Sequence, residues 1–393
     1  MSDTAPNPSW RSWALDEAEE VRAAGRWRAP RTFTPVAGSA IEGSVTADDG
    51  TGDTTKTVPV VSFASNDYLG LTHHPAVIAA AHDAIDRWGT GAGAARLIVG
   101  SRPVHDELEA ELADWKHAEQ AVLFSTGFAA NLGVLTTFAG PDVLVCSDEL
   151  NHASLVDGRR LAGAPLAVYR HCDAAHVDRL LRDSDAGRVL VVTESVFSMD
   201  GDVAPVEELV EVCARHGALL VVDEAHAALE PDPDFGDADV LRVGTLSKTL
   251  GALGGYVAGS RHFTDLLVNR ARSYIFTTAS TPADAAAALA AVRVVRSPEG
   301  DALRARLRAN IDRVCPGHPS PIIPYVCGSE SRALAAAAAL RDDGLLVTAI
   351  RPPTVPPGTS RLRVAISAAH DDAQLDHLAA ALTRVFGDEI GSS

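Results

Sequence analysis

Between residues 107 and 259 the sequence alternates between segments with helical periodicity and short apolar runs rich in valine and leucine. The runs AVLFS, DVLVCS, LAVYR, RVLVVTES and LLVVD have the length of strands, and an amphipathic helical pattern separates each run from the next. Such alternation predicts βα crossovers that build a mostly parallel sheet with helices on both faces. The sequence therefore predicts an α/β fold.

The two ends of the chain lack this regular alternation of strand and helix patterns. Residues 1–60 are predicted to form an arm, with a helical stretch at 12–24 and a polar stretch at 41–57 that suits a hairpin or a loop. We expect a large domain at 61–280 and a small C-terminal α/β domain of helices and a few strands at 281–393. The crevice between the two domains is then the expected site.

One stretch of the large domain directs two reactive side chains toward the same edge of the sheet. The run LLVV ends abruptly in Asp223, and the apolar run at 240–245 is followed by a turn that carries Lys248. Open α/β sheets bind ligands at the carboxyl ends of their strands. A carboxylate and a lysine placed there suit pyridoxal phosphate, whose ring nitrogen needs an acid and whose aldehyde needs a lysine. The residues alone leave open that Asp223 only caps a helix and that Lys248 is a solvated surface charge.

Two stretches look like nucleotide-binding loops. In TLSKT, Ser247 stands where a phosphate-binding loop needs a glycine before its lysine, so we discard that interpretation. Glycines 89, 91 and 93 mimic a dinucleotide fingerprint, but they follow a helical pattern instead of a strand. Neither stretch therefore indicates a nucleotide site.

Charge and cysteine content narrow the range of partners. A formal net charge of −18 opposes nucleic acid, because a phosphate backbone needs a basic footprint. No apolar stretch spans a membrane without an interrupting charge, and the start MSDTAPNPSW lacks the basic flank and apolar core of a signal peptide. The five cysteines are scattered without paired metal spacing. We expect a cytoplasmic protein with buried thiols, no metal and no membrane or nucleic-acid partner.

Separated motifs across roughly residues 60 to 385 resemble the α-oxoamine synthase family of fold-type I pyridoxal phosphate enzymes. The motifs are NDYLGL, STGF, NHASLVDG, ESVFSMDGD, DEAH, TLSK and RPPTVPPGTSRLR. The resemblance implies a large domain built on a mostly parallel seven-stranded sheet, a smaller C-terminal domain and pyridoxal 5′-phosphate as cofactor. It also implies a homodimer with shared active sites.

The resemblance carries the roles of the reacting residues to matching positions of this chain. Lys248 would bind the cofactor aldehyde and then take a proton from the substrate, while Asp223 would keep the ring nitrogen protonated. His152 would stack on the ring, and Ser198 and His226 would lie near its phenolic oxygen. These residues, Ser198 apart, form the expected catalytic set.

The resemblance also places the phosphate and the substrates. A helix start offers free N–H groups to a phosphate, and the resemblance assigns that contact to Gly127, Phe128 and Thr245, with Thr277 and Thr278 donated by the partner subunit. Arg26, with Arg28 as the alternative, would receive the acyl substrate, and Asn66 would lie near the amino acid. Thr354 would contact substrate, and Arg363, set by the preceding prolines, would clamp a carboxylate.

The motif RPPTVPPGTSRLR resembles the branch that condenses L-alanine with a pimeloyl thioester to 8-amino-7-oxononanoate in biotin synthesis. The acyl carrier, coenzyme A or an acyl carrier protein, is left open. The chain departs from the family at Ala94 and Ala95, and in the loop after His226, which is shorter and lacks the usual glycines. Two alternatives stay open: a glycine-using activity with an acetyl or succinyl thioester, and an inactive member that serves as a binding subunit.

Overall fold

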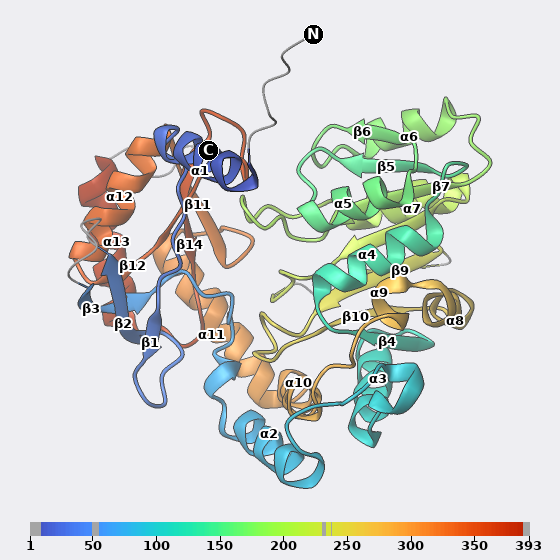
Figure 1. Ribbon diagram of the computed structural model, residues 1–393, viewed down its shortest axis with the longest axis horizontal. Helices are drawn as coiled ribbons and strands as arrows, with labels where there is room; N and C mark the ends of the chain where they lie inside the picture. The colour runs from blue at the N-terminus through green and yellow to red at the C-terminus, as the bar shows by residue number, and fades with distance from the viewer. Residues whose placement is uncertain (1–8, 49–54, 230–232, 237, 388–393) are drawn as a thin grey trace.

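The computed structural model describes residues 9–48, 55–229, 233–236 and 238–387. Its largest element is a seven-stranded sheet in the order β4-β10-β9-β8-β7-β5-β6 (Figure 1). Strand β10 is antiparallel to both neighbours, and the other pairs are parallel. The predicted α/β fold with a mostly parallel seven-stranded sheet is confirmed. The strands are β4 (Gln120–Phe124), β5 (Leu144–Asp148), β6 (Leu166–Tyr169), β7 (Val189–Glu194), β8 (Leu219–Asp223), β9 (Val240–Thr245) and β10 (Gly255–Gly259).

Helices cover both faces of this sheet because successive side chains of its central strands point to opposite faces. In β8, Val221 joins an apolar cluster with residues of α4, whereas Leu220 and Val222 join a cluster with residues of α6 and α7 on the other face. The helices of this region are α3 (Pro103–Trp115), α4 (Gly127–Phe138), α5 (Ala153–Ala162), α6 (Ala174–Arg182), α7 (Val206–His216), α8 (Arg261–Arg270) and α9 (Arg272–Ile275).

The N-terminal segment joins the C-terminal part of the chain. After α1 (Trp10–Ala23), strands β1 (Phe33–Pro35), β2 (Glu42–Asp48) and β3 (Thr55–Ser62) pair antiparallel, and β3 pairs in parallel with β12 (Leu345–Leu346). The stretch predicted as a hairpin or a loop therefore contains an antiparallel strand pair, and residues 49–54 lie outside the described residues. Figure 1 accordingly shows the blue strands beside the red C-terminal elements.

The C-terminal region consists of helices around a second small sheet. Its three strands are in the order β11 (Ile322–Gly328), β14 (Ser360–Ala365) and β13 (Thr348–Ile350). The run LLVTAI, which the sequence suggests is one strand, is divided: β12 pairs with β3, and β13 pairs with β14. The helices are α10 (Pro282–Val295), α11 (Pro298–Val314), α12 (Glu330–Asp342) and α13 (Asp372–Phe386), and α2 (Pro75–Trp88) packs against α10. The domain boundaries near residues 60 and 280 stay predictions.

The structure also bears on the membrane and on the cysteines. Among the described helices, none combines the length and the apolar character required to cross a bilayer. All five cysteines are free thiols, and Cys146, Cys213 and Cys327 are buried. The cytoplasmic location stays a prediction.

Candidate active site

Asp223 ends β8 as a buried carboxylate held by two donors. Its Oδ2 accepts a hydrogen bond from Nδ2 of Asn131 in α4 at 2.6 Å, and its Oδ1 accepts one from the backbone N–H of Ala225 at 2.9 Å. The side chain of Asn131 is itself 2% exposed. Because one partner lies in the covering helix and the other in the turn that directly follows β8, the direction of the carboxylate is fixed before any ligand binds.

Lys248 follows β9 and meets His226 from the turn after β8. Its Nζ lies 2.8 Å from Nε2 of His226. Burial lowers the pKa of Lys248 and the charge of Arg363 adds to the effect, while the charges of Asp223 and Glu194 oppose it. Burial also lowers the pKa of His226 to well below its usual range, with the lysine charge adding to the effect. A neutral His226 that accepts from Lys248 through Nε2 carries its proton on Nδ1.

A chain of hydrogen bonds continues from His226 to Arg363 of β14. The phenolic oxygen of Tyr68 lies 2.7 Å from Nδ1 of His226 and donates to Oδ1 of Asn66 at 3.0 Å. Nη2 of Arg363 donates to Oδ1 of Asn66 at 3.1 Å and to the oxygen of Tyr68 at 3.3 Å. Nε of Arg363 donates to the carbonyl of Ser198 at 2.6 Å. The structure thus brings the predicted Asn66, Ser198, His226, Lys248 and Arg363 into one network.

His152 is linked to Asp223 through Ser154 and Asn131. It caps the N-terminus of α5, and its Nδ1 lies 2.7 Å from Oγ of Ser154. The same Oγ accepts from Nδ2 of Asn131 at 2.9 Å, and Asn131 also donates to Asp223. Ser154 therefore orients the imidazole of His152, and Asn131 connects Ser154 to Asp223. His152 itself is exposed.

The start of α4 forms a close-packed turn of small residues. Gly127 is its first residue, after the N-cap Thr126, and a Cβ at Gly255 would lie 2.5 Å from the backbone nitrogen of Gly127. Thr245 lies beside this turn, and its Oγ1 donates to the carbonyl of Gly254 at 3.1 Å. Free N–H groups at a helix start bind anions, so this turn can hold a phosphate. Phe128, the second residue of the helix, is 45% exposed.

The residues predicted to receive the acyl substrate lie where the arm meets the loop before β14. Arg26 is exposed and pairs with Glu330 at 3.4 Å, and Nη2 of Arg28 donates to the carbonyl of Pro352 at 3.0 Å. Thr354 is exposed in the same loop. Their predicted contacts with substrate stay predictions.

Thr277 and Thr278 follow α9 and line a small hollow together with Arg96 and Ser125. In the part of the chain that the structure describes, no hydrogen bond joins either threonine to the residues around Lys248. Their predicted donation to a partner subunit stays a prediction.

Three residues of this region, Tyr68, Asn131 and Glu194, were not predicted from the sequence to belong to the site. Tyr68 is fully buried, yet its hydroxyl belongs to the site. Glu194 ends β7 and lies directly opposite Asp223 in the sheet register. Burial raises the pKa of Glu194 well above its usual range, and the charge of Asp223 adds to the effect. Glu194 ends an apolar run and Asn131 interrupts one. A polar residue at such a position is a sequence signal by which both could have been predicted.

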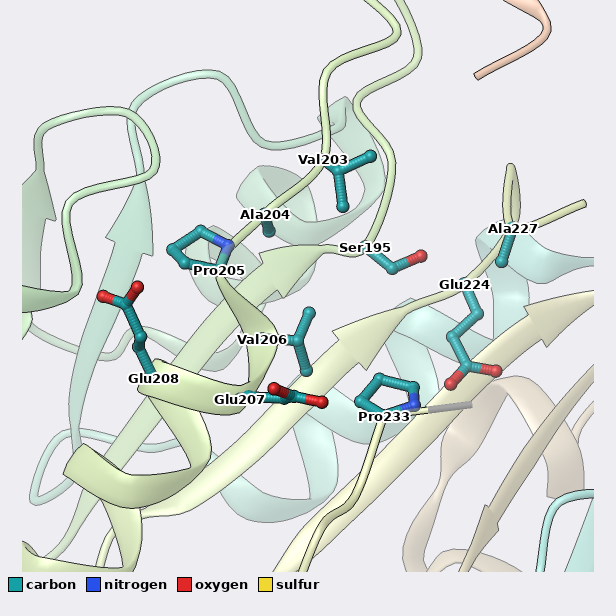
Figure 2. Close-up of a pocket in the computed structure, with 10 residues that line it drawn as sticks. All are labelled: Ser195, Val203, Ala204, Pro205, Val206, Glu207, Glu208, Glu224, Ala227 and Pro233. Atoms are coloured by element: carbon teal, nitrogen blue, oxygen red, sulfur yellow. The ribbon is translucent and has the colours of Figure 1, made fainter. Parts of the chain in front are cut away.

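A separate cavity of about 340 Å³ lies beyond the turn that carries His226. Figure 2 shows Glu224 and Ala227 of that turn facing the first residues of α7 and Pro233 across it. Neither Asp223 nor Lys248 lines this cavity, so it is distinct from the network described above.

Comparison with protein-family models identifies the chain. Residues 58–382 match the model described as aminotransferase class I and II. The chain belongs to the aminotransferase class I and II family. Members of this family use pyridoxal phosphate, and the predicted cofactor is confirmed.

Individual members of the aminotransferase class I and II family are similar to this chain over most of its length. An 8-amino-7-oxononanoate synthase of Anaeromyxobacter dehalogenans is 49% identical over 393 residues, which cover 96% of each chain. A serine palmitoyltransferase from S. paucimobilis, solved with a bound PLP-myriocin aldimine, is 29% identical with a TM-score of 0.86 over 96% of this chain and 99% of that one. A solved 8-amino-7-oxononanoate synthase from Francisella tularensis is 25% identical, with a TM-score of 0.69 over 83% of this chain and 96% of that one. The resemblance read from the motifs is confirmed, and the chain is an enzyme of the acyltransferase type.

The geometry of the site fits the cofactor of this family. The start of α4 offers N–H groups for the phosphate, and Asp223 offers a buried carboxylate for the ring nitrogen. Asp223 ends β8, and Lys248 follows the neighbouring parallel strand β9, so the acid and the amine lie at the same edge of the sheet. The roles of Asp223 and Lys248 toward the cofactor stay predictions.

Proposed function

We propose that this chain catalyses the decarboxylative condensation of L-alanine with a pimeloyl thioester, which yields 8-amino-7-oxononanoate, carbon dioxide and the free thiol carrier. The observation that carries this proposal is the continuous network from Lys248 through His226 and Tyr68 to Arg363. This network joins Lys248, the proposed proton acceptor, to Arg363, the proposed carboxylate-binding group. The identity of 49% to a synthase of that name supports the choice of reaction.

The residues of this network can hold the amino acid and move its proton. When bound, pyridoxal phosphate supplies an electron sink for negative charge at the α-carbon of the substrate. Lys248, with its lowered pKa, takes the proton from that carbon as a neutral amine. Neutral His226 holds Nζ of Lys248 through Nε2, and Arg363 binds the substrate carboxylate with its charged fork. Asp223 keeps a proton on the ring nitrogen.

The acyl substrate would enter between the arm and the loop before β14. Arg28 and Arg351 tie these two segments together, because Arg28 donates to Pro352 and Nη1 of Arg351 donates to the carbonyl of Gly25 at 2.8 Å. Arg28 and Arg351 give this entrance positive charge in a protein whose net charge is −18, while Arg26 beside them pairs with Glu330. Coenzyme A and acyl carrier protein are both anionic, so this charge suits either carrier.

We also infer a homodimer with shared sites, supported by an apolar surface next to Thr277 and Thr278. Phe276 is 70% exposed and Ile98 is 73% exposed. Their segments are joined by a hydrogen bond from the backbone N–H of Ala279 to the carbonyl of Ala94 at 3.0 Å. A second copy that covered these side chains would bury apolar surface and bring the two threonines to its own phosphate.

Steady-state assays of the purified, cofactor-loaded protein test the reaction. Alanine is compared with glycine, and pimeloyl-CoA and pimeloyl carrier protein are compared with acetyl-CoA, with product identified by mass spectrometry. We expect alanine with a pimeloyl thioester to exceed glycine with acetyl-CoA by at least about tenfold in kcat/KM, and Lys248→Ala to abolish turnover. Preference for glycine would show the sister activity, and a cofactor-loaded protein without turnover on any pair would show a binding subunit.

A further inference from the structure

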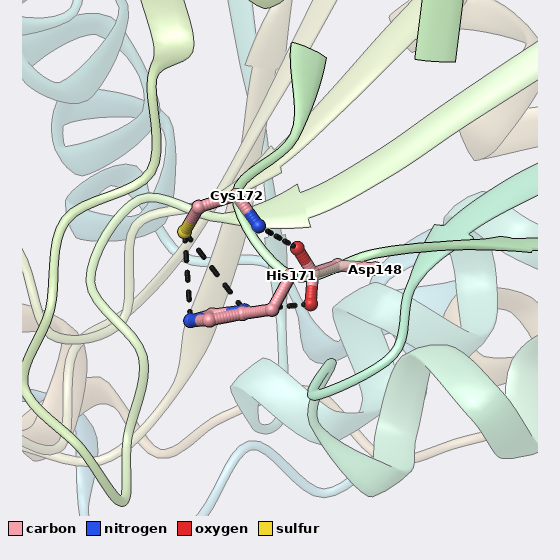
Figure 3. A group of neighbouring side chains, drawn as sticks. All are labelled: Asp148, His171 and Cys172. Atoms are coloured by element: carbon pink, nitrogen blue, oxygen red, sulfur yellow. Dashed lines mark hydrogen bonds and ion pairs between the residues drawn. The ribbon is translucent and has the colours of Figure 1, made fainter. Parts of the chain in front are cut away.

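A cluster of polar side chains outside the proposed site joins the ends of two strands to a turn. Figure 3 shows Asp148, which ends β5, beside His171 and Cys172, which follow β6. Oδ1 of Asp148 lies 2.9 Å from Nδ1 of His171, and Oδ2 accepts from the backbone N–H of Cys172 at 2.9 Å. Nε2 of His171 contacts the carboxylate of Asp202. The imidazole therefore has one carboxylate at each ring nitrogen.

Asp202 belongs to a turn that also contains Ser198, whose carbonyl accepts from Arg363. Val196 and Val203 form an isolated antiparallel bridge, and the backbone N–H of Phe197 donates to the carbonyl of Asp202 at 3.0 Å, so residues 196–203 form a closed turn. The ring of Phe197 meets the ring of His171 edge to face, with centroids 4.4 Å apart. His171 thus holds the turn through a polar contact with Asp202 and an aromatic contact with Phe197.

The same turn contacts both arginines of β14. The carbonyl of Ser198 accepts from Nε of Arg363 at 2.6 Å, and Asp200 pairs with Arg361. The turn also packs closely on the small domain, since a Cβ at Gly201 would lie 2.0 Å from the carbonyl oxygen of Ile322. It is therefore the link between the edge of the large sheet and the guanidinium proposed to bind substrate.

We propose that His171 is a positioning residue for the amino acid substrate: it joins Asp148 to Asp202 and so fixes the turn whose Ser198 carbonyl orients Arg363. The inference rests on the proposed role of Arg363. A planar guanidinium binds a carboxylate through two parallel hydrogen bonds, so its direction decides the strength of binding. An unfixed turn lets Nε of Arg363 lose its acceptor, and the fork then turns away from the substrate.

A metal ion is the competing interpretation of this cluster. Asp148, His171 and Cys172 each offer a ligand atom, and these atoms lie within 4.8 Å of one another. Figure 3, however, shows the thiol over one face of the imidazole, where Sγ is 3.8 Å from Nδ1 and 3.5 Å from Nε2. A metal bound by histidine lies in the plane of the ring, along the lone pair of one nitrogen. The thiol therefore does not point to the place where the ring would hold a metal.

Two amide substitutions separate the two contacts of His171. In His171→Asn the amide nitrogen takes the place of Nδ1 and reaches Asp148 but not Asp202. In His171→Gln it takes the place of Nε2 and reaches Asp202. We expect His171→Asn to raise KM for alanine about tenfold with kcat within about twofold, and His171→Gln to raise it by about threefold or less. KM for the acyl thioester stays unchanged in both, and so do all constants in the control His216→Asn, whose ring pairs with Asp178 on the surface.

Amide hydrogen exchange of residues 196–203 reports on the turn without any assay of activity. We expect faster exchange in His171→Asn than in the wild type and in His171→Gln. If His171→Asn does not fold, Asp202→Ala replaces it, and we expect faster exchange in that variant too. Unchanged exchange, or an unchanged KM for alanine in an active enzyme, overturns the proposal. Faster exchange in a protein without turnover would instead contradict the proposed reaction. The metal interpretation would replace the proposed role of His171 if the protein bound zinc stoichiometrically and Cys172→Ala raised KM for alanine as much as His171→Asn.

Discussion

The phenolic oxygen of Tyr68 lies 2.7 Å from Nδ1 of His226. This contact leaves Nε2 of the same ring as the acceptor for Lys248 at 2.8 Å. Tyr68 is fully buried and packs in the apolar core, so one side chain both fills the interior and sets the tautomer of a histidine. The orientation of the reactive lysine therefore depends on a hydroxyl that the apolar pattern around Tyr68 does not reveal.

Tyr68→Phe removes that hydroxyl and keeps the ring. Nδ1 of His226 loses its partner, so the histidine no longer has a fixed tautomer with which to hold Lys248. We expect kcat to fall about tenfold, which corresponds to one hydrogen bond of about 1.4 kcal/mol. Tyr169→Phe is the matched control, because its buried hydroxyl donates to the carbonyl of Val192 away from Lys248. If both variants lost kcat equally, the role of Tyr68 would be general packing.

Asn131→Ala removes the side-chain donor to Asp223 and the link to Ser154. The carboxylate then has only the backbone N–H of Ala225 to direct it. We expect affinity for pyridoxal phosphate, measured by spectroscopic titration of the apoenzyme, to fall about tenfold, as for loss of one charge-assisted hydrogen bond. Asn310→Ala is the control, since its buried amide bonds to the carbonyls of Ser367 and His370 in the small domain. It should lower the free energy of unfolding without changing cofactor affinity.

Glu194→Gln tests the raised pKa of Glu194. A carboxyl whose pKa is raised by folding holds its proton better in the folded state, so its contribution to stability is lost as pH rises from about 4.3 toward the raised pKa. The glutamine has no proton to lose. We expect the free energy of unfolding of the variant to gain on the wild type as pH rises through this window, by up to about 1.4 kcal/mol per pH unit. Urea unfolding of the apoenzyme measures this, and exposed Glu208→Gln should show no such gain.

Lys116→Met tests a buried ion pair beneath the turn that carries His226. Nζ of Lys116 lies 2.9 Å from Oε2 of Glu224, whose side chain is 4% exposed and also pairs with Arg242. Removing the lysine takes one charge-assisted hydrogen bond from the buried Glu224 carboxylate, which keeps its pair with Arg242, so the free energy of unfolding should fall by about 2 kcal/mol. Arg160→Met, which breaks an exposed pair with Asp157, should cost less than about 1 kcal/mol. Equal losses in the two variants would contradict a structural role for the pair.

The sequence predicts structure well where burial imposes a local pattern of apolar residues. The run LLVVD predicted a buried strand that ends in a carboxylate, and β8 ends at Asp223 with both of its faces covered by helices. The same kind of pattern predicted β4, β5, β6, β7 and β9, whereas the count of seven strands came from the family resemblance. The pattern failed at LLVTAI, where two residues pair with β3 and three with β14, because an apolar run does not state which strand it will join.

The sequence by itself determined the sheet, its helices and the edge at which Asp223 and Lys248 lie, because periodicity and strand ends are local properties of a buried chain. Only the tertiary structure decided which distant residues meet there. Tyr68 and His226 are 158 positions apart, and Asn131 and Asp223 are 92 apart. Such contacts depend on how crossovers stack one strand beside another, and a single side chain carries no local mark of the partner it will find.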